Sequence, residues 1–219
     1  MYIAAVKSFL RVRETTRSDT ILIESGLPSI TERIRKRTAA FVKKELLENE
    51  RDKTPLMKIY RICGMKQTRG YRFIRDAMLP VERQPARIPP SQRFLTERGT
   101  KAETYRLLNP ELKVHPVYTS KNYIDERARI CFTRLRLSSH SLKVETGRWS
   151  RIAREERLCR CGGSIEDEEH VLLRCPETDG AREKFHVNRE EYTDVGRLMN
   201  NLDVNVLIPF VDCCMRVFK

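Results

Sequence analysis

Hydrophobic residues recur at helical spacing in several stretches of this chain, whereas patterns typical of strands are weak. Apolar positions in residues 29–48 follow a period near 3.6, and Ser29 with Glu32 forms a capping box at the start. Residues 123–137 show the same spacing, with arginines on the other positions. Residues 205–218 are largely apolar and predict a terminal helix that packs back on the protein, with Pro209 starting or kinking it. The pattern predicts a mainly α fold with bundle-like helical segments.

The first 26 residues predict two short helices. An apolar stripe of Ile3, Val6 and Leu10 marks the first. In the second, Ser18 or Asp19 is the expected N-cap, and Gly26 is the expected terminator because glycine adopts the left-handed conformation without strain.

Basic side chains exceed acidic ones, and the excess lies in the first two thirds of the chain. The 219 residues include 43 Lys and Arg against 30 Asp and Glu, a formal net charge of +13. Residues 1–150 hold 32 basic and 16 acidic side chains, whereas residues 151–219 hold 11 and 14. This field suits a polyanionic partner such as nucleic acid. No apolar run approaches the roughly 18 residues of a membrane span, so no membrane partner is expected.

Two basic segments in the first third are candidates for phosphate contact. The polar face of the helix at residues 29–48 carries Arg33, Arg37 and Lys44. This face is either an ordinary solvated surface or a phosphate-contacting one. Residues 56–79 interleave basic and aromatic side chains, which either clamp a nucleic-acid strand or pack as an amphipathic helix.

Three cysteines and one histidine have the spacing of a metal site. Cys159, Cys161, His170 and Cys175 supply three thiolates and one imidazole, a set that suits tetrahedral Zn²⁺. A catalytic zinc is disfavoured, because four protein ligands close the coordination sphere. The sequence therefore predicts a structural zinc in a small knuckle, and free buried thiols are the alternative.

The residues between the ligands predict the local geometry. Gly162 permits a tight turn after the first two cysteines, and Ser164 is the expected cap of a helix that contains His170. At about 100° per residue, His170 and Cys175 do not share one helical face. Cys175 is therefore expected just past the helix end, where Pro176 stops the helix. The single residue between Cys159 and Cys161 is shorter than the two residues usual in such turns.

The remaining cysteines are expected to pack in the core. The total of seven is odd and unevenly spaced, and no secretory h-region precedes them, which indicates a reducing, intracellular compartment. Neither His115 nor His140 has a Ser or Cys partner at the spacing of a nucleophilic triad. The four cysteines outside the knuckle are Cys63, Cys131, Cys213 and Cys214.

Prolines at positions 80, 85, 89 and 90 predict a linker near residues 80–93. The expected organisation is a basic helical region at residues 1–79, followed by a Pro-rich and irregular segment at residues 80–121. Residues 122–219 then hold the Arg-rich helix, the zinc knuckle and the terminal helix.

Residues 127–185 resemble the C-terminal region of non-LTR (LINE-type) retrotransposon reverse transcriptases. The resemblance rests on "RLR", on "GRW", and on "CRC" followed by "EDEEHVLLRC". It implies zinc ligands at Cys159, Cys161, His170 and Cys175. It also places the family's arginines at Arg134, Arg136 and Arg148 beside Trp149. Such polymerases use two adjacent aspartates to hold metal ions, and this sequence has no Asp-Asp pair.

The sequence therefore predicts a non-catalytic fragment that binds RNA or an RNA–DNA hybrid within a ribonucleoprotein, in the cytoplasm or the nucleus. A zinc-stabilised protein-interaction scaffold and an inert element relic are the alternatives. Arg127 and Arg134, seven residues apart, are expected to contact phosphates, and Arg136 is expected to dock on the acidic run of the knuckle. Trp149 is either a core residue or a platform for base stacking. The nucleic-acid surface predicted from these arguments comprises Arg127, Arg134, Arg136, Arg148, Trp149, Arg33, Arg37 and Lys44.

Overall fold

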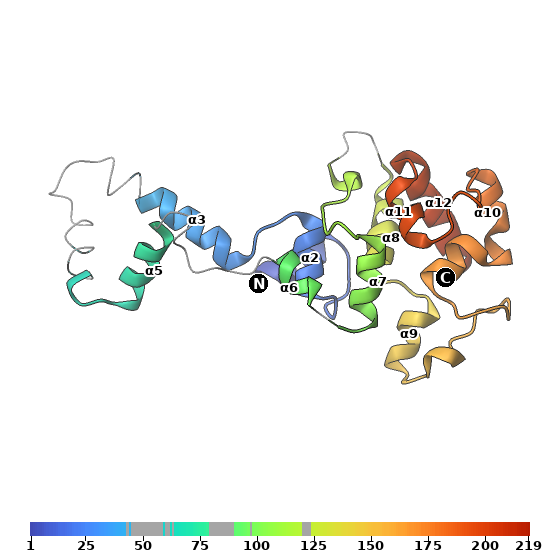
Figure 1. The fold of residues 1–219 in the computed structure, drawn as a ribbon, viewed down its shortest axis with the longest axis horizontal. Helices are drawn as coiled ribbons and strands as arrows, with labels where there is room; N and C mark the ends of the chain where they lie inside the picture. The colour runs from blue at the N-terminus through green and yellow to red at the C-terminus, as the bar shows by residue number, and fades with distance from the viewer. Residues whose placement is uncertain are drawn as a thin grey trace. The chain divides into compact units, whose positions relative to one another are not determined.

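The computed structural model describes residues 1–42, 44, 59, 62, 64–78, 90–96, 98–119 and 124–219 (Figure 1). Helices provide the regular structure of these residues, which include no strand beyond one isolated bridge between Leu158 and Ile165. The predicted mainly α fold is confirmed. Within these ranges, none of the helices combines the length and apolar character that a membrane span requires.

Most of the helices are short. They are α1 (Tyr2–Phe9), α2 (Ser18–Ser25), α3 (Ile30–Val42), α5 (Arg69–Met78), α6 (Pro90–Leu95), α7 (Thr100–Leu108), α8 (Glu126–Arg136), α9 (Lys143–Trp149), α10 (Asp179–Lys184), α11 (Val195–Asn201) and α12 (Val204–Val217). Single turns are η3 (Pro116–Tyr118), η4 (Arg154–Glu156), η5 (His170–Arg174) and η6 (Pro176–Thr178). The predicted linker lies mostly outside the described residues.

The chain divides into two compact units. Unit 1 comprises residues 1–26 and 90–219, and unit 2 comprises residues 27–89, in which α3 packs on α5. This division differs from the three consecutive segments predicted from the sequence. The physical reason is a shared hydrophobic cluster that joins the first two helices to α6, α7 and the end of α8. Its buried members are Val6, Leu10, Ile21, Ile23, Phe94, Ala102, Tyr105 and Leu137.

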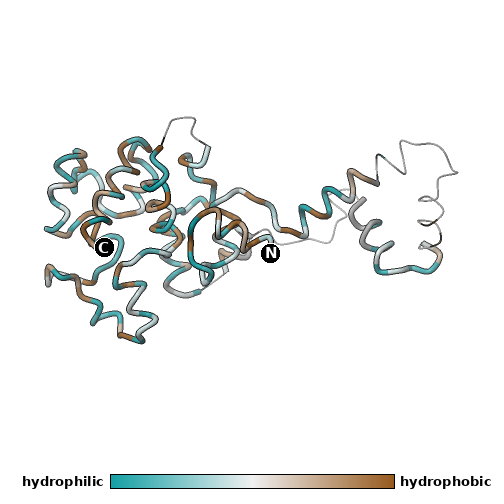
Figure 2. Tube along the Cα trace, turned by 180° about the vertical axis from the view of Figure 1, so that it is seen from behind, coloured by the Kyte–Doolittle hydropathy of each residue, from teal (hydrophilic) through white to brown (hydrophobic). Residues whose placement is uncertain are grey.

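The larger core of unit 1 forms where α12 packs against α8. Phe132 and Leu135 of α8 meet Phe210 and Cys214 of α12 in one buried cluster. Hydrophobic and hydrophilic residues alternate along the helices, as amphipathic packing requires (Figure 2). The terminal helix therefore packs back on the protein, as predicted, and the structure identifies the Arg-rich helix as its partner.

Local sequence signals explain several helix ends. Gly26 ends α2 in the left-handed conformation, with φ of 64°, as predicted. The predicted cap of α2 is wrong, because the helix already begins at Ser18 and its N-cap, Arg17, makes no side-chain cap bond. Asp125 caps α8 by accepting from the Ala128 amide at 2.9 Å. Pro209 lies inside α12 and does not start it.

Candidate metal centre

A narrow hairpin-like loop positions the first two cysteines. The bridge between Leu158 and Ile165 closes the loop, and the Cys159 amide donates to the Ser164 carbonyl at 2.8 Å. Gly162 turns the chain at φ of 74°, in the left-handed region that favours glycine. Because the loop is this tight, a single intervening residue suffices to aim Cys159 and Cys161 at the same point.

A wide turn positions the histidine and the third cysteine. Residues His170–Arg174 form a π turn, in which the Cys175 amide donates to the His170 carbonyl at 2.7 Å. Hydrogen bonds between residues five apart bring these two ligands above one another, and π turns occur often at functional sites. Cys175 lies just past the end of this turn in extended conformation, as predicted.

The predicted helix cap in this segment is wrong. The His170 amide donates to the Asp167 side chain at 3.0 Å, so Asp167 caps the turn that carries the histidine. Ser164 belongs to the preceding loop, where its carbonyl accepts from Cys159. Ser164 and Asp167 are both common N-cap residues. Asp167 is the cap here because Ser164 is part of the closed loop.

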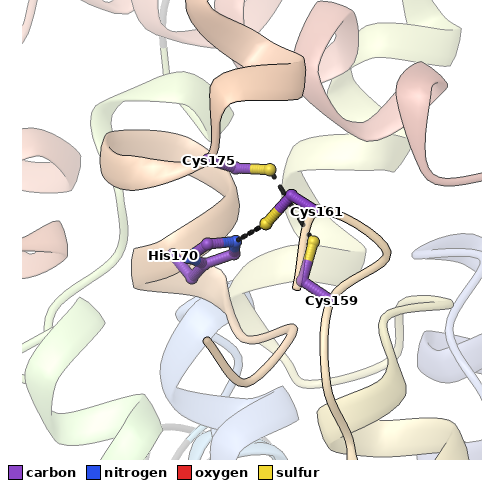
Figure 3. A group of neighbouring side chains, drawn as sticks. All are labelled: Cys159, Cys161, His170 and Cys175. Carbon is purple, nitrogen blue, oxygen red and sulfur yellow. Dashed lines mark hydrogen bonds between the residues drawn. The ribbon is translucent and has the colours of Figure 1, made fainter. Parts of the chain in front are cut away.

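The four predicted ligands converge on one point (Figure 3). Their ligand atoms all lie within 4.8 Å of one another. The sulfurs of Cys159 and Cys175 are 3.7 Å apart, and the Cys161 sulfur is 3.2 Å from Nε2 of His170. A tetrahedron with metal–sulfur bonds of about 2.3 Å has sulfur–sulfur edges of about 3.8 Å. The cluster therefore has the composition and the spacing of a site that can hold a tetrahedral metal ion.

The environment of the ligands separates their proton affinities. Burial raises the pKa of Cys175 to about 12 and also raises that of Cys159. The Gly163 amide, which donates to the Cys161 sulfur at 3.5 Å, lowers the pKa of Cys161. Burial lowers the pKa of His170, which favours the neutral imidazole that binds metals. A metal ion would displace the thiol protons, since the thiolate is the ligand form.

Two residues outside the ligand set hold the π turn in shape. Thr178 donates to the Val171 carbonyl at 2.7 Å, and the buried guanidinium of Arg182 donates to the carbonyls of Leu172 and Cys175. These bonds satisfy carbonyls that the end of a turn leaves without partners. The sequence does not predict this role of Arg182, because there the residue looks like a surface arginine of a short helix.

Replacing Arg182 by alanine is expected to lower metal affinity by about 10- to 100-fold, the usual effect of losing a side chain that orients a ligand. The measurement is competition with a chromophoric zinc chelator. Arg189→Ala is the matched control, because Arg189 also pairs with Asp179 and is exposed, but forms no hydrogen bond or ion pair with the described residues of the turn. Equal affinities for the two variants would remove Arg182 from the support of the site.

His140 joins the metal centre to the end of α8, although its sequence context marks it as an ordinary polar position. Its Nε2 lies 2.9 Å from Oε1 of Glu168, and both side chains are buried. Burial alone would raise the pKa of Glu168, but the hydrogen bond and charge of His140 lower it overall. Glu168 lies two residues before the π turn, so the pair fixes the turn against the α8–α9 connection.

The remaining cysteines pack away from this cluster. Cys214 is buried in the larger core, and Cys131 and Cys213 are half-buried against it. Core packing was predicted for these three residues and is confirmed. Cys63 lies outside the described residues.

The predicted nucleic-acid residues have different surroundings. Arg127 and Arg134 are exposed on α8 and line one cleft. Arg148 pairs with the buried carboxylate of Glu145 at 3.3 Å. Trp149 is 54% exposed, so it is not a core residue. In unit 2, exposed positions hold Arg33, Arg37 and Lys44.

Arg136 is the clear correction. The sequence places it on the nucleic-acid surface or against the acidic run of the knuckle, but its side chain is fully buried. Its Nε donates to Glu24 at 2.6 Å, and its Nη1 donates to the Leu108 carbonyl at 2.8 Å. Tyr105 also donates to Glu24, at 2.8 Å. The guanidinium therefore ties α8 to α2 and α7 and has no access to a ligand.

The chain has no counterpart in the comparisons with known proteins. No protein-family model matches it, and no curated protein or solved structure does so either.

Proposed function

We propose that this protein is a non-catalytic nucleic-acid-binding module whose C-terminal part is organised by a structural zinc ion. The carrying observation is that Arg127 and Arg134 are exposed seven residues apart on α8, and neither is ion-paired within the described residues. Arginines two helical turns apart lie on one face and suit successive phosphates. The proposed ligand is RNA or an RNA–DNA hybrid, consistent with the net charge of +13.

Zinc is proposed as the metal from the chemistry of the donors. Three thiolates and one imidazole at tetrahedral spacing select Zn²⁺ over the hard cations that prefer oxygen ligands. The buried residues of the π turn, Val171 and Leu172, belong to the larger core. Bound zinc would thereby stabilise the core that supports α8, since α12 packs on both the turn and α8.

The resemblance to the C-terminal region of LINE-type reverse transcriptases is part of this proposal. It is supported by the convergence of the four residues that the resemblance names as zinc ligands. The protein would then act beside a polymerase in an element ribonucleoprotein and would not itself polymerise.

The direct test is binding of a labelled RNA at 50 to 200 mM salt. Neutralised phosphates release counterions, so log K is expected to fall linearly with log salt, with a slope of about −0.7 per contact on a single strand. Affinity without salt dependence, or no binding, would contradict the proposal.

A protein-interaction scaffold is the second candidate, and one observation favours it. In unit 2, Ile30, Ile34 and Phe41 of α3 are about half exposed. Exposed apolar side chains that recur along one helix are typical of partner surfaces. A scaffold would not show the salt slope described above.

The purified protein is expected to extend no primer when it is supplied with a primed template, Mg²⁺ and nucleoside triphosphates. Polymerases of the resembled family hold two catalytic metal ions with adjacent aspartates, and the sequence has no such pair. The measurement is gel analysis of a labelled primer, with a known reverse transcriptase as positive control. Extension that is lost when acidic residues of this chain are replaced would overturn the expectation.

A further inference from the structure

A basic cleft of about 820 Å³ lies in unit 1 beside α8. It is bounded by the segment after α1, by one side of α8, by the α8–α9 connection and by the end of α12. Two acidic side chains, Asp125 and Glu126, also line it. The five cationic side chains in its wall are Arg11, Arg13, Arg127, Arg134 and Lys219.

The five cationic side chains of the cleft outnumber its two carboxylates. Within the described residues, none of the five forms an ion pair, whereas eight other arginines of unit 1 pair with carboxylates. The Asp125 carboxylate is already engaged with the Ala128 amide as the cap of α8. A net positive field therefore faces the cleft, and clefts with walls of low dielectric concentrate such a field on a ligand.

Hydrogen bonds hold the two sides of the cleft together. Nε of Arg134 donates to the Arg11 carbonyl at 2.7 Å, and the Arg13 amide donates to the Ser139 hydroxyl at 2.9 Å. These bonds fix the segment after α1 against α8 and its following loop. The Arg134 guanidinium is thus positioned before any ligand arrives, which lowers the entropy cost of binding.

Arg13 connects the cleft to the exposed tryptophan. Its guanidinium carbon lies 3.9 Å from the centroid of the Trp149 ring, within the range of a cation–π contact. Trp149 still exposes 54% of its surface. Arg13 therefore links the cleft to an aromatic ring that is partly open to solvent.

We infer that this cleft is the binding site for single-stranded nucleic acid, with backbone phosphates on Arg127 and Arg134 and an unpaired base stacked on Trp149. The inference rests on the proposed function; it adds where the nucleic acid binds and that the bound form is single-stranded. Only an unpaired base presents a free face to an indole, because the bases of a duplex are already stacked on each other. The cleft volume lies in the range of pockets for small ligands, about 300 to 1,000 Å³, which suits a short stretch of nucleotides.

The experiment is fluorescence anisotropy with labelled oligouridylate, oligodeoxythymidylate and duplex RNA of equal length, at several salt concentrations. The wild-type protein should prefer the single strands. Arg127→Ala combined with Arg134→Ala should weaken binding and flatten the salt slope by about 1.4, because each contact contributes about 0.7. Trp149→Leu should weaken single-strand binding about 5- to 150-fold with an unchanged slope, and Trp149→Phe should retain part of the affinity.

Arg98→Ala combined with Arg197→Ala is the charge-matched control, since both side chains are exposed and lie outside the cleft. If losing the hydrogen bond from Arg134 to the Arg11 carbonyl destabilises the fold, the single variant Arg127→Glu replaces the double variant. RNA binding whose salt dependence is the same in the cleft variants and in the control would overturn the inference but leave the proposed function standing. If no polynucleotide binds, both fail. Equal competition by polyglutamate would overturn the ligand class in favour of an acidic protein.

Discussion

Cys175→Ser is expected to abolish metal binding and to lower the free energy of unfolding by about 4 kcal/mol or more, the size typical of losing a structural metal. Cys175 is fully buried, and the neighbouring residues Val171 and Leu172 belong to the larger core. Without the metal, the loop of Cys159 and the π turn lose the link that joins them. For a chain of this length, such a loss corresponds to a fall in Tm of about 10 °C.

The measurement is thermal unfolding followed by circular dichroism, with and without a chelator. Cys213→Ser is the control, because Cys213 is half-buried and lies outside the four-residue cluster. The control should keep its metal and respond to chelation as the wild type does. A wild-type protein whose transition does not move on chelation would show that the thiols are ordinary core residues.

Arg136→Met is expected to destabilise the protein by about 3 to 5 kcal/mol, because it leaves the buried carboxylate of Glu24 without its cation. Both side chains of this ion pair are fully buried. The remaining bond from Tyr105 does not neutralise the charge. Urea unfolding at neutral pH measures the loss.

The double variant Arg136→Met with Glu24→Leu separates the ion pair from its burial. Removing both charges is expected to restore much of the stability, since apolar side chains of similar volume often replace a buried pair at little cost. The double-mutant cycle gives the interaction free energy between Arg136 and Glu24. The folded double variant should bind RNA with the same salt dependence as the wild type. A flatter slope would show that Arg136 contacts the nucleic acid.

The ligand set of the metal centre could be predicted because its information is local. Cys159 and His170 are eleven positions apart, and Gly162 marks the turn between them. The position of Cys175 past the turn also follows from Pro176. The π turn and its cap could not be predicted, because the closed loop removes Ser164 from the competition with Asp167.

The burial of the arginines could not be predicted from local sequence. Arg134 and Arg136 look alike in "RLR", yet one is exposed and the other is fully buried. The difference is set by Glu24, which lies 112 positions earlier in the chain. The cleft is equally non-local, because Arg11 and Arg13 come from the N-terminal segment. Helix positions, by contrast, follow from apolar spacing, and α8 and α12 lie close to the predicted ranges.

X-ray absorption spectroscopy of the zinc-loaded protein shows directly whether the four residues coordinate the metal. We expect one zinc per chain, coordinated by three sulfurs at about 2.3 Å and one imidazole nitrogen at about 2.0 Å. Cys161→Ser should reduce the sulfur count by one, because Cys161 belongs to the cluster. A coordination shell of nitrogen and oxygen alone, or a protein that retains no zinc after dialysis, would show that these residues form no structural zinc site.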